Sequence, residues 1–384
     1  MPAASPIHCA FSANEDEWQA ADDLASQLTQ PDIGFVLFFC SAEYNLDRLA
    51  EALRHCFPNV ELAGCTTAGE LTTQGYRQHS ISAIGFSRVS FTVGTSLIEA
   101  LDNYPLPQAQ QDLDQLILDA KAQSNLAAEG DFFALTLIDG LSSEEEQVLL
   151  TLDAALGRIP HFGGSAGDDI HLANTHVYTQ GAFHSSAAIV VLFHTALPFE
   201  VFTTHHMQPL AQKLVVTQAD PATRTVFELD AEPAAEAYAR LVGQPVAELT
   251  PKHFALHPLA VKLGNDYYVR SIQRVNDDLS LTFYCAVGNG IVLTPMTPQP
   301  ILPDLQQRFA DIEQRIGTPL VTIVCDCFLR RLETEHLDAL DDASKFLMEH
   351  RVIGFNTYGE HFGGVHLNQT FTGVVIGAGD DQPQ

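Results

Sequence analysis

Residues 34–40 read Gly-Phe-Val-Leu-Phe-Phe-Cys, an unbroken apolar run of strand length. Such a run is typical of a strand that is covered on both faces. The segment 46–56 has the pattern of a helix, and residues 59–65 return as a short strand. This order predicts two parallel strands that are joined by a crossover helix.

The neighbouring segments continue the alternation of helices and strands. The patterns before and after the opening unit predict, in chain order, a helix over 14–28, strands over 80–86 and 88–97, a helix over 113–128, a strand over 131–138 and a helix over 144–156. A Gly-rich loop is expected over 162–169, because three glycines lie close together there.

The second half is expected to contain hairpins and then another α/β segment. The patterns there predict a helix over 233–241, strands over 260–263, 267–275 and 279–284, a Pro-rich extended loop over 293–303, a helix over 304–316, a strand over 320–327, a mainly helical segment over 334–349, and strands over 352–358 and 371–376. We therefore predict an α/β to α+β fold, a two-lobed mixed-sheet protein with βαβ units and antiparallel hairpins.

A length of 384 residues makes two domains the natural expectation. We place the division near Ala219, which gives regions over 30–219 and 220–376. Residues 1–29 are then an N-terminal extension that carries a helix, and 377–384 a frayed tail. The two regions share an order of strands, helix and Gly-rich loop, which is too little to establish a duplication.

The charge balance excludes several classes of partner. The chain has 19 Lys and Arg against 48 Asp and Glu, a formal net charge of −29 at pH 7. Nucleic acids and anionic membrane surfaces need clustered basic residues, so neither is expected as a partner. No apolar run is long enough for a transmembrane helix, and the N-terminus lacks the features of a signal peptide. The seven cysteines form no regular framework, which favours thiols in the cytoplasm.

The loop that contains Gly163, Gly164, Ser165 and Asp168 is the first candidate site. Its glycines allow the backbone to approach a ligand closely, and its carboxylates can orient an amine or cap neighbouring amides. An ordinary structural loop explains the same residues equally well. Ser165 lacks the nucleophile-elbow motif, so catalysis by this serine is not expected.

Two adjacent histidines, His205 and His206, are the candidate metal ligands. Neighbouring side chains of a strand point to opposite faces, so only one of the pair can bind a given metal ion. No Cys/His cluster has the spacing of a zinc site, whereas a single axial histidine is enough for haem iron. Three histidines beside Gly-rich segments are rival ligands: His161, His361 and His366.

A third candidate site ends the strand at 320–327. Cys325 and Cys327 form a Cys-x-Cys pair that can act in thiol redox chemistry or bind a metal. Arg330 can bind a ligand carboxylate or pair with a nearby acid. Glu360, in the next Gly-bearing turn, can orient a ligand, but it has no evident partner for acid–base catalysis. We therefore do not expect an enzyme.

Six motifs in order make the chain resemble the FIST-domain family, with FIST-N and FIST-C regions in tandem. They read Gly-Cys-Thr-Thr-Ala-Gly-Glu over 64–70, Asp-Gly-Leu-Ser over 139–142, and Gly-Gly-Ser-Ala-Gly-Asp over 163–168. They continue with Cys-x-x-Arg over 327–330, and with Gly-Phe-Asn-Thr-Tyr-Gly-Glu over 354–360 and His-Leu-Asn-Gln-Thr over 366–370 in the last turns. The resemblance covers residues 30–376.

The resemblance implies a bacterial signal-transduction sensor that binds a ligand. Stand-alone members of the family bind haem, sense nitric oxide, partner a sensor histidine kinase and influence cyclic-di-GMP signalling and biofilm formation. By that likeness the chain would bind haem, and its lack of the Cys-x-x-Cys-His motif of covalent attachment makes this non-covalent haem b. We expect His205 or His206 as the iron ligand, because they lie where the two regions meet. Two alternatives stay open, a sensor of another small molecule such as an amino acid and a thiol redox sensor. The resemblance leaves room for a homo-oligomer.

Overall fold

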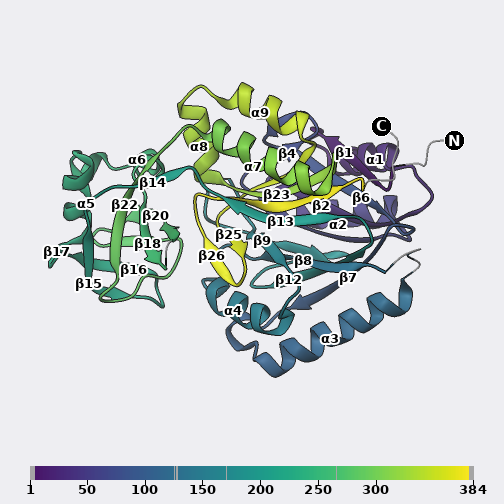
Figure 1. Cartoon of the computed structure of the whole chain (residues 1–384), viewed down its shortest axis with the longest axis horizontal. Helices are drawn as coiled ribbons and strands as arrows, with labels where there is room; N and C mark the ends of the chain where they lie inside the picture. The colour runs from purple at the N-terminus through teal and green to yellow at the C-terminus, as the bar shows by residue number, and fades with distance from the viewer. Residues whose placement is uncertain (1–4, 125, 127–128, 170, 265, 380–384) are drawn as a thin grey trace.

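The computed structural model describes residues 5–124, 126, 129–169, 171–264 and 266–379. It consists of a main body and a smaller lobe, which lies at the left in Figure 1. Three six-stranded sheets form the main body, and one nine-stranded sheet forms the small lobe. The predicted mixed α/β to α+β class with two lobes is confirmed.

The opening βαβ unit is present as predicted. Strand β2 (Ile33–Ser41) leads through helix α2 (Leu46–Cys56) to β3 (Glu61–Thr67), and the two strands are parallel. Asn45 caps the helix by accepting a hydrogen bond from the backbone N–H of Arg48. The hairpin β4 (Glu70–Thr72) and β5 (Gly75–Arg77) follows, and β6 (Ile81–Ser87) returns antiparallel to β2.

The same sequence of elements occurs twice more, and we call the three copies repeats one, two and three. Repeat two comprises β8 (Asp131–Ile138), α4 (Glu145–Leu156), β9 (His161–Ser165), β10 (Val177–Thr179), β11 (Ala182–His184) and β12 (Ala188–Thr195). Repeat three comprises β23 (Pro319–Cys327), α8 (Phe328–His336), α9 (Leu340–Glu349), β24 (Val352–Thr357), β25 (Glu360–Phe362), β26 (Val365–Leu367) and β27 (Phe371–Gly377).

Each repeat contributes its hairpin to the sheet of another repeat. Strand β4 of repeat one pairs with β24 of repeat three, and β25 of repeat three pairs with β9 of repeat two. Strand β10 of repeat two closes the cycle by pairing with β3 of repeat one. The three repeats are therefore interlocked in a ring rather than joined end to end.

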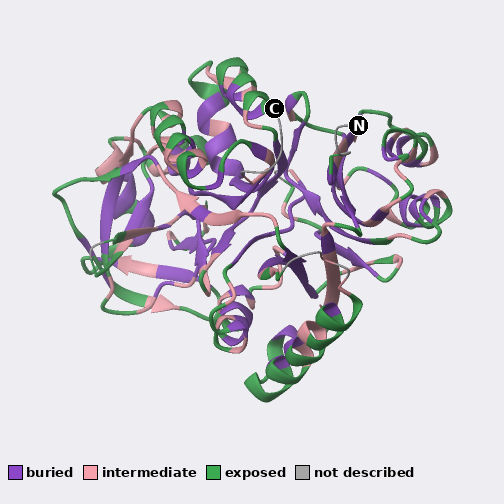
Figure 2. Cartoon of the chain, turned by 45° about the vertical axis from the view of Figure 1, so that its right-hand side comes forward, coloured by how far each residue is buried: buried purple, intermediate pink, exposed green. Residues whose placement is uncertain are grey.

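The sheets share one apolar core and are covered by helices on their outer faces. Alternate residues of β2 divide between the two layers: Phe35, Leu37 and Phe39 enter the shared core, and Val36 and Phe38 face helices α1 (Glu17–Gln27) and α2. This double burial explains the unbroken apolar run in the sequence. Figure 2 shows the buried strands inside and the exposed outer faces of the helices.

A glycine occupies the same place in the second parallel strand of every repeat. A Cβ atom built at Gly64, Gly163 or Gly354 would lie 2.2, 1.9 or 1.8 Å from a carbonyl oxygen of the neighbouring strand. No side chain can be accommodated at such a distance. These glycines are therefore required by the close approach of two backbones.

The remaining elements of the main body extend its sheets and cover them. Strand β1 (Ile7–Ser12) pairs with β6, β7 (Phe91–Ile98) with β12, and β13 (Phe199–Thr204) with β27. The covering helices outside the repeats are α1, α3 (Leu106–Gln123), the short η1 (Leu101–Asn103) and α7 (Ile301–Ile316). The segment 1–29, predicted as an extension, thus supplies β1 at the edge of the first sheet and helix α1, which covers that sheet.

The small lobe is formed by residues 207–298. Its elements are β14 (Met207–Pro209), β15 (Leu214–Asp220), β16 (Thr225–Leu229), β17 (Glu232–Pro233), α5 (Ala234–Val242), η2 (Val246–Glu248), α6 (Pro251–Leu256), β18 (Leu259–Leu263), β19 (Asp266–Arg270), β20 (Ile272–Val275), β21 (Leu281–Phe283) and β22 (Val292–Pro298). The chain then returns to the main body with α7, so repeat three lies beside repeats one and two.

Two predicted loops are wrong in part. Residues 161–165 form β9 rather than the start of a Gly-rich loop, and 292–298 form β22 rather than an extended loop. Glycine and proline lower strand propensity, but strand pairing decides the outcome in both places. The end of the helix predicted over 113–128 and most of the predicted tail lie outside the described residues, whereas Gly377 ends β27.

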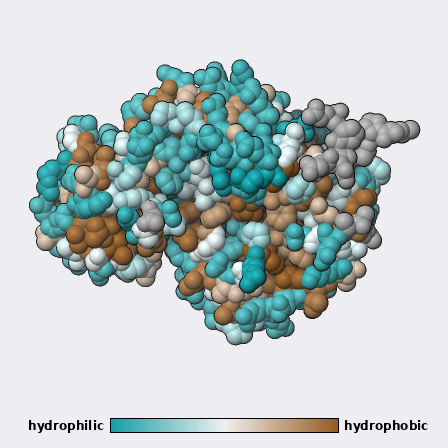
Figure 3. Space-filling view, in the orientation of Figure 1, coloured by the Kyte–Doolittle hydropathy of each residue, from teal (hydrophilic) through white to brown (hydrophobic). Residues whose placement is uncertain are grey.

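The surface in the view of Figure 3 is mostly hydrophilic, with hydrophobic areas that are separated from one another. No helix in the described part of the chain is long and apolar enough to cross a membrane.

Candidate functional site

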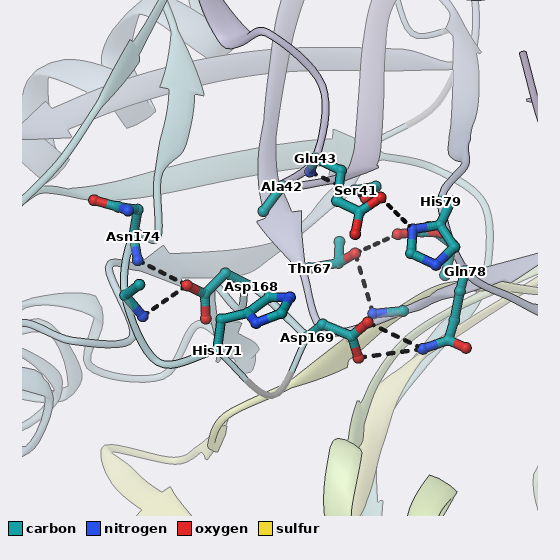
Figure 4. A pocket seen from close by; sticks show the side chains of 13 residues that line it. Ser41, Ala42, Glu43, Thr67, Gln78, His79, Asp168, Asp169, His171 and Asn174 are labelled. Carbon is teal, nitrogen blue, oxygen red and sulfur yellow. Dashed lines mark hydrogen bonds and ion pairs between the residues drawn. The ribbon is translucent and has the colours of Figure 1, made fainter. Parts of the chain in front are cut away.

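A polar pocket of about 210 Å³ lies where repeats one and two meet (Figure 4). Its walls are segments that follow strands: 41–43 after β2, 67–70 between β3 and β4, 78–79 after β5, and parts of 168–174 after β9. The parallel pair β2 and β3 therefore points its carboxyl end at the pocket. Ligands of open α/β sheets bind at this end of the strands.

Asp168 stabilises the loop that follows β9 by bonding to the backbone of that loop. Its carboxylate accepts hydrogen bonds from the backbone N–H groups of Leu172, Ala173 and Asn174, at 2.9, 2.7 and 2.7 Å. The hydroxyl of Tyr358 donates a further hydrogen bond to it. Asp168 therefore caps neighbouring amides, one of the two roles considered for it, and has little capacity left for a ligand.

Asp169 and Glu43 are the carboxylates that face the pocket with capacity to spare. Asp169 has a left-handed backbone, with φ of 61°, and accepts hydrogen bonds from Gln78 at 3.2 Å and from Arg331 at 3.1 Å. Glu43 lies 2.6 Å from His79, and both side chains are more than half exposed. The described residues that line the pocket include four carboxylates and neither lysine nor arginine.

Glu70 is the buried carboxyl group at the back of this pocket. Its Oε2 accepts hydrogen bonds from the backbone N–H and hydroxyl of Ser80, at 3.2 and 2.6 Å, and the Thr67 hydroxyl donates to Oε1. Burial raises the pKa of Glu70 to about 7, although these hydrogen bonds lower it. Near neutral pH the group is therefore partly protonated, which reduces the negative charge at the back of the pocket.

This raised pKa predicts a pH-dependent stability difference between the wild type and Glu70→Gln. Below pH about 4.5 the wild-type side chain is neutral in both states, so the difference is constant. Between that pH and about pH 7 the Glu70 carboxyl group loses its proton in the unfolded chain before it does in the folded protein. The wild type should therefore lose on the order of 3 kcal/mol of stability relative to the variant. Melting temperatures of both proteins from pH 4 to 8 measure this effect, and parallel curves would contradict it.

Two protein-family models match the chain and identify its family. The FIST N domain matches residues 34–232, and the FIST C domain matches residues 234–363. The chain belongs to the FIST family. The resemblance seen in the sequence is thus confirmed, and FIST domains are sensor domains of signal transduction rather than catalytic domains. A search of curated proteins gives no significant match.

Repeats one and two lie in the FIST N match, together with β14, β15 and β16 of the small lobe. The rest of the small lobe, from α5 onward, and most of repeat three lie in the FIST C match. The polar pocket is thus formed entirely by residues of the FIST N match. Its rim segments 41–43 and 78–79 were missed by sequence reasoning. Neither has a recognisable motif, and they meet only because β6 returns beside β2.

Gly163, Gly164 and Ser165 lie inside the protein, away from the pocket. The Ser165 hydroxyl is 3.1 Å from Nε2 of His361, and Nδ1 of the same ring is 2.9 Å from the hydroxyl of Thr136. The site resembles a serine–histidine pair, but a threonine occupies the place of the acid and all three side chains are buried. Burial lowers the pKa of His361 well below its usual value. The arrangement is consistent with the expected absence of catalysis by Ser165.

Glu360 occupies in repeat three the place that Glu70 has in repeat one. Its Oε2 accepts hydrogen bonds from the backbone N–H and hydroxyl of Thr370, at 3.0 and 2.9 Å. The side chain is completely buried, and burial raises its pKa well above the usual value. Glu360 therefore holds the hairpin of repeat three, and it lies outside the cavities described here.

Arg330 lies in a buried chain of charged groups together with one of the two candidate histidines. Its Nε donates to Asp326 at 2.9 Å, and its Nη1 donates to Nδ1 of His206 at 2.6 Å. Nε2 of His206 lies 2.9 Å from the carboxylate of Glu333. Both ring nitrogens of His206 are therefore in use, and the Arg330 guanidinium is already paired.

Cys325 and Cys327 are both fully buried in the core. Burial raises the pKa of each thiol well above its usual value. Because the thiolate is the reactive form, this setting opposes the redox chemistry considered for the Cys-x-Cys pair. All seven cysteines of the chain are free thiols.

His205 lies beside a cavity of about 380 Å³ between the two lobes. The cavity is lined by residues of β13 and β19 and by side chains near the hairpin of repeat three, including Tyr267 and Phe362. Nδ1 of His205 accepts a hydrogen bond from the backbone N–H of Met207 at 3.3 Å. When the His205 ring is neutral, Nδ1 must be unprotonated to accept this hydrogen bond, so the proton of the ring is on Nε2.

Proposed function

We propose that this FIST protein senses a small amine-bearing molecule, such as an amino acid, which binds in the polar pocket. The observation that supports this most directly is the charge of that pocket. Glu43 and Asp169 offer carboxylate oxygens, and no lysine or arginine lies among the described lining residues of the pocket, although Arg331 pairs with Asp169 from outside this lining. A cationic amine suits these groups, whereas a phosphate or another anion does not.

The size and position of the pocket suit a small ligand that acts as a signal. A volume of about 210 Å³ lies below the range of roughly 300–1,000 Å³ that drug-sized ligands occupy. A ligand there would touch the loop after β9 in repeat two and the ends of the hairpin of repeat one. That hairpin pairs with β24 of repeat three, so binding can favour one arrangement of the interlocked repeats over another.

A thermal-shift screen of the purified protein with the standard amino acids, putrescine and spermidine tests this proposal. A ligand at about 100 times its Kd should stabilise the wild type by roughly 2.7 kcal/mol. The stabilisation should be largely lost in Glu43→Gln, whose exposed side chain lies at the pocket rim. Glu51→Gln, an exposed change on α2, is the matched control and should respond as the wild type does. No response to any of these compounds would count against the proposal.

A second candidate ligand is haem b, sensed together with nitric oxide. The cavity beside His205 favours it, because a histidine and aromatic side chains lie together there. His206 does not fit as the iron ligand, since both of its ring nitrogens are bonded. His205 fits by position, but it would have to give up its bond from Met207 and carry its proton on Nδ1. The larger cavity of about 600 Å³ beside α7 has no histidine among its described lining residues.

Absorbance spectra of the tag-free protein after addition of haemin test this second candidate. We expect a Soret band that is lost in His205→Ala and retained in His206→Ala. A band that persists in both variants would contradict the choice of ligand. The absence of a band in the wild type would exclude haem as the cofactor.

For either ligand, the output that we propose is contact with a sensor histidine kinase in the cytoplasm and an influence on cyclic-di-GMP signalling and biofilm formation. The proposal follows from the family resemblance. The net charge of −29 supports a partner with a basic contact surface, because opposite charges speed association.

A further inference from the structure

Three side chains with metal-binding atoms come together where the small lobe meets the main body. Glu146 is on helix α4, Cys285 follows β21 of the small lobe, and His366 is in strand β26. Their donor atoms all lie within 4.8 Å of one another. Nδ1 of His366 is 3.6 Å from the Cys285 sulfur and 3.5 Å from Oε1 of Glu146.

The geometry excludes a catalytic triad at this cluster. A cysteine–histidine–acid triad needs the thiol on one ring nitrogen and the carboxylate on the other. Here both groups approach Nδ1 of His366, and Nε2 has no hydrogen-bond partner among the described residues. Three donors that converge on one point are instead the arrangement of a metal site.

The two separations that involve His366 also agree with tetrahedral coordination. With Zn–S of about 2.3 Å and Zn–N of about 2.1 Å, the tetrahedral angle places the sulfur and nitrogen about 3.6 Å apart. A nitrogen and a carboxylate oxygen, each about 2.1 Å from the metal, are about 3.4 Å apart. The observed values of 3.6 and 3.5 Å match both expectations.

We propose that Glu146, Cys285 and His366 bind one divalent transition-metal ion of the zinc class and leave its fourth coordination position open. Cysteine, histidine and carboxylate are ordinary zinc ligands, and three protein ligands with one open position distinguish reactive sites from closed structural ones. The site is independent of the proposed amine pocket and of haem.

The surroundings of the cluster suit a dication. The Ala286 N–H donates to Oε1 of Glu146 at 2.7 Å, and Arg224 pairs with Glu146 and Glu145, so the ligand carboxylate is held in place. The two glutamates and the Cys285 thiolate together carry three negative charges, which balance the positive charges of Arg224 and a doubly charged ion. Cys285 and His366 are buried, whereas the Glu146 side chain is 32% exposed and gives the ion a way in.

A dication at this site would use the Nδ1 lone pair of His366 and would displace any proton from that atom.

Titration of the tag-free, metal-free full chain with Co²⁺ tests the proposal directly. We expect one Co²⁺ per chain, with visible d–d bands of a tetrahedral site and a near-ultraviolet sulfur-to-cobalt charge-transfer band, and we expect Zn²⁺ to displace the cobalt. Glu146→Gln, a partly exposed position that should fold, should weaken Co²⁺ binding at least about tenfold while keeping the sulfur band.

Cys285→Ser should abolish the charge-transfer band, and His366→Gln should abolish tight binding. Cys56→Ser, which changes a partly exposed cysteine on α2, is the matched control and should bind as the wild type does. Absence of a sulfur band in the wild type overturns the proposal without reference to any variant. A band that survives in folded Cys285→Ser, judged by circular dichroism, overturns it as well.

Discussion

We expect Arg330→Met to lower the free energy of unfolding by about 3–5 kcal/mol, the cost of breaking a buried ion pair from one side. Arg330 is buried and bonds to Asp326 and His206. Its guanidinium also lies 5.7 Å from the centre of the Phe371 ring. The substitution would leave the carboxylate of Asp326 in the core without its cation, and methionine cannot supply a donor.

The control for this prediction is Arg240→Met in the small lobe. Arg240 pairs with Glu232, but the side chains are 64% and 47% exposed, so water replaces the lost partner. Chemical denaturation followed by circular dichroism measures both variants. If Arg330→Met were as stable as the control, the buried charges would not contribute to the fold as we describe.

Gly354→Ala is expected to destabilise the protein by at least about 3 kcal/mol. A Cβ atom there would lie 1.8 Å from the carbonyl oxygen of Val324, so β23 and β24 would have to separate. The clash is with backbone atoms, and no side-chain rotation can relieve it. Gly354 also pairs with β4 of repeat one, so the substitution would disturb the pairing of this hairpin with the sheet of repeat three as well.

Gly288→Ala is the matched control, because its nearest neighbour in the structure is a Pro221 carbon at 4.0 Å and its φ is not positive. It should be neutral or slightly stabilising. Melting temperatures of the two variants and the wild type give the comparison. Equal stability of Gly354→Ala and Gly288→Ala would mean that the strands are less closely spaced than described.

The βαβ unit and the hairpins follow from periodicity that is visible in the sequence. The apolar run over 34–40 has the length and composition of a doubly covered strand, and it is one. The ring of repeats could not be predicted, because its links are strands of three residues that pair across the chain. Repeats one and three share a Gly-x-x-Thr-x-Gly-Glu pattern over 64–70 and 354–360, and an acid–hydroxyl pair at Glu70 with Ser80 and at Glu360 with Thr370. Repeat two lacks this pattern and keeps the glycine at the strand contact.

The roles of some candidate residues could be predicted from the sequence and those of others could not, because the latter depend on contacts between segments that are distant along the chain. Asp168 was identified from the Gly-rich motif, and its role as a cap depends only on residues close in sequence. Glu43 and Gln78 reach the same pocket from other segments, and neither stands in a motif. Gly163 and Ser165 look like loop residues in the sequence, but the pairing of β9 with β8 and β25 places them in the interior.

Hydrogen–deuterium exchange of the full chain, with and without each amino acid and polyamine of the screen, tests the central claim most directly. The account predicts that at least one compound slows exchange in the pocket segments 41–43, 67–70, 78–79 and 171–174, and that the cavity beside His205 is unaffected. Protection at residues 203–205 and 266–269 instead, or no protection by any compound, would contradict the polar pocket as the sensing site.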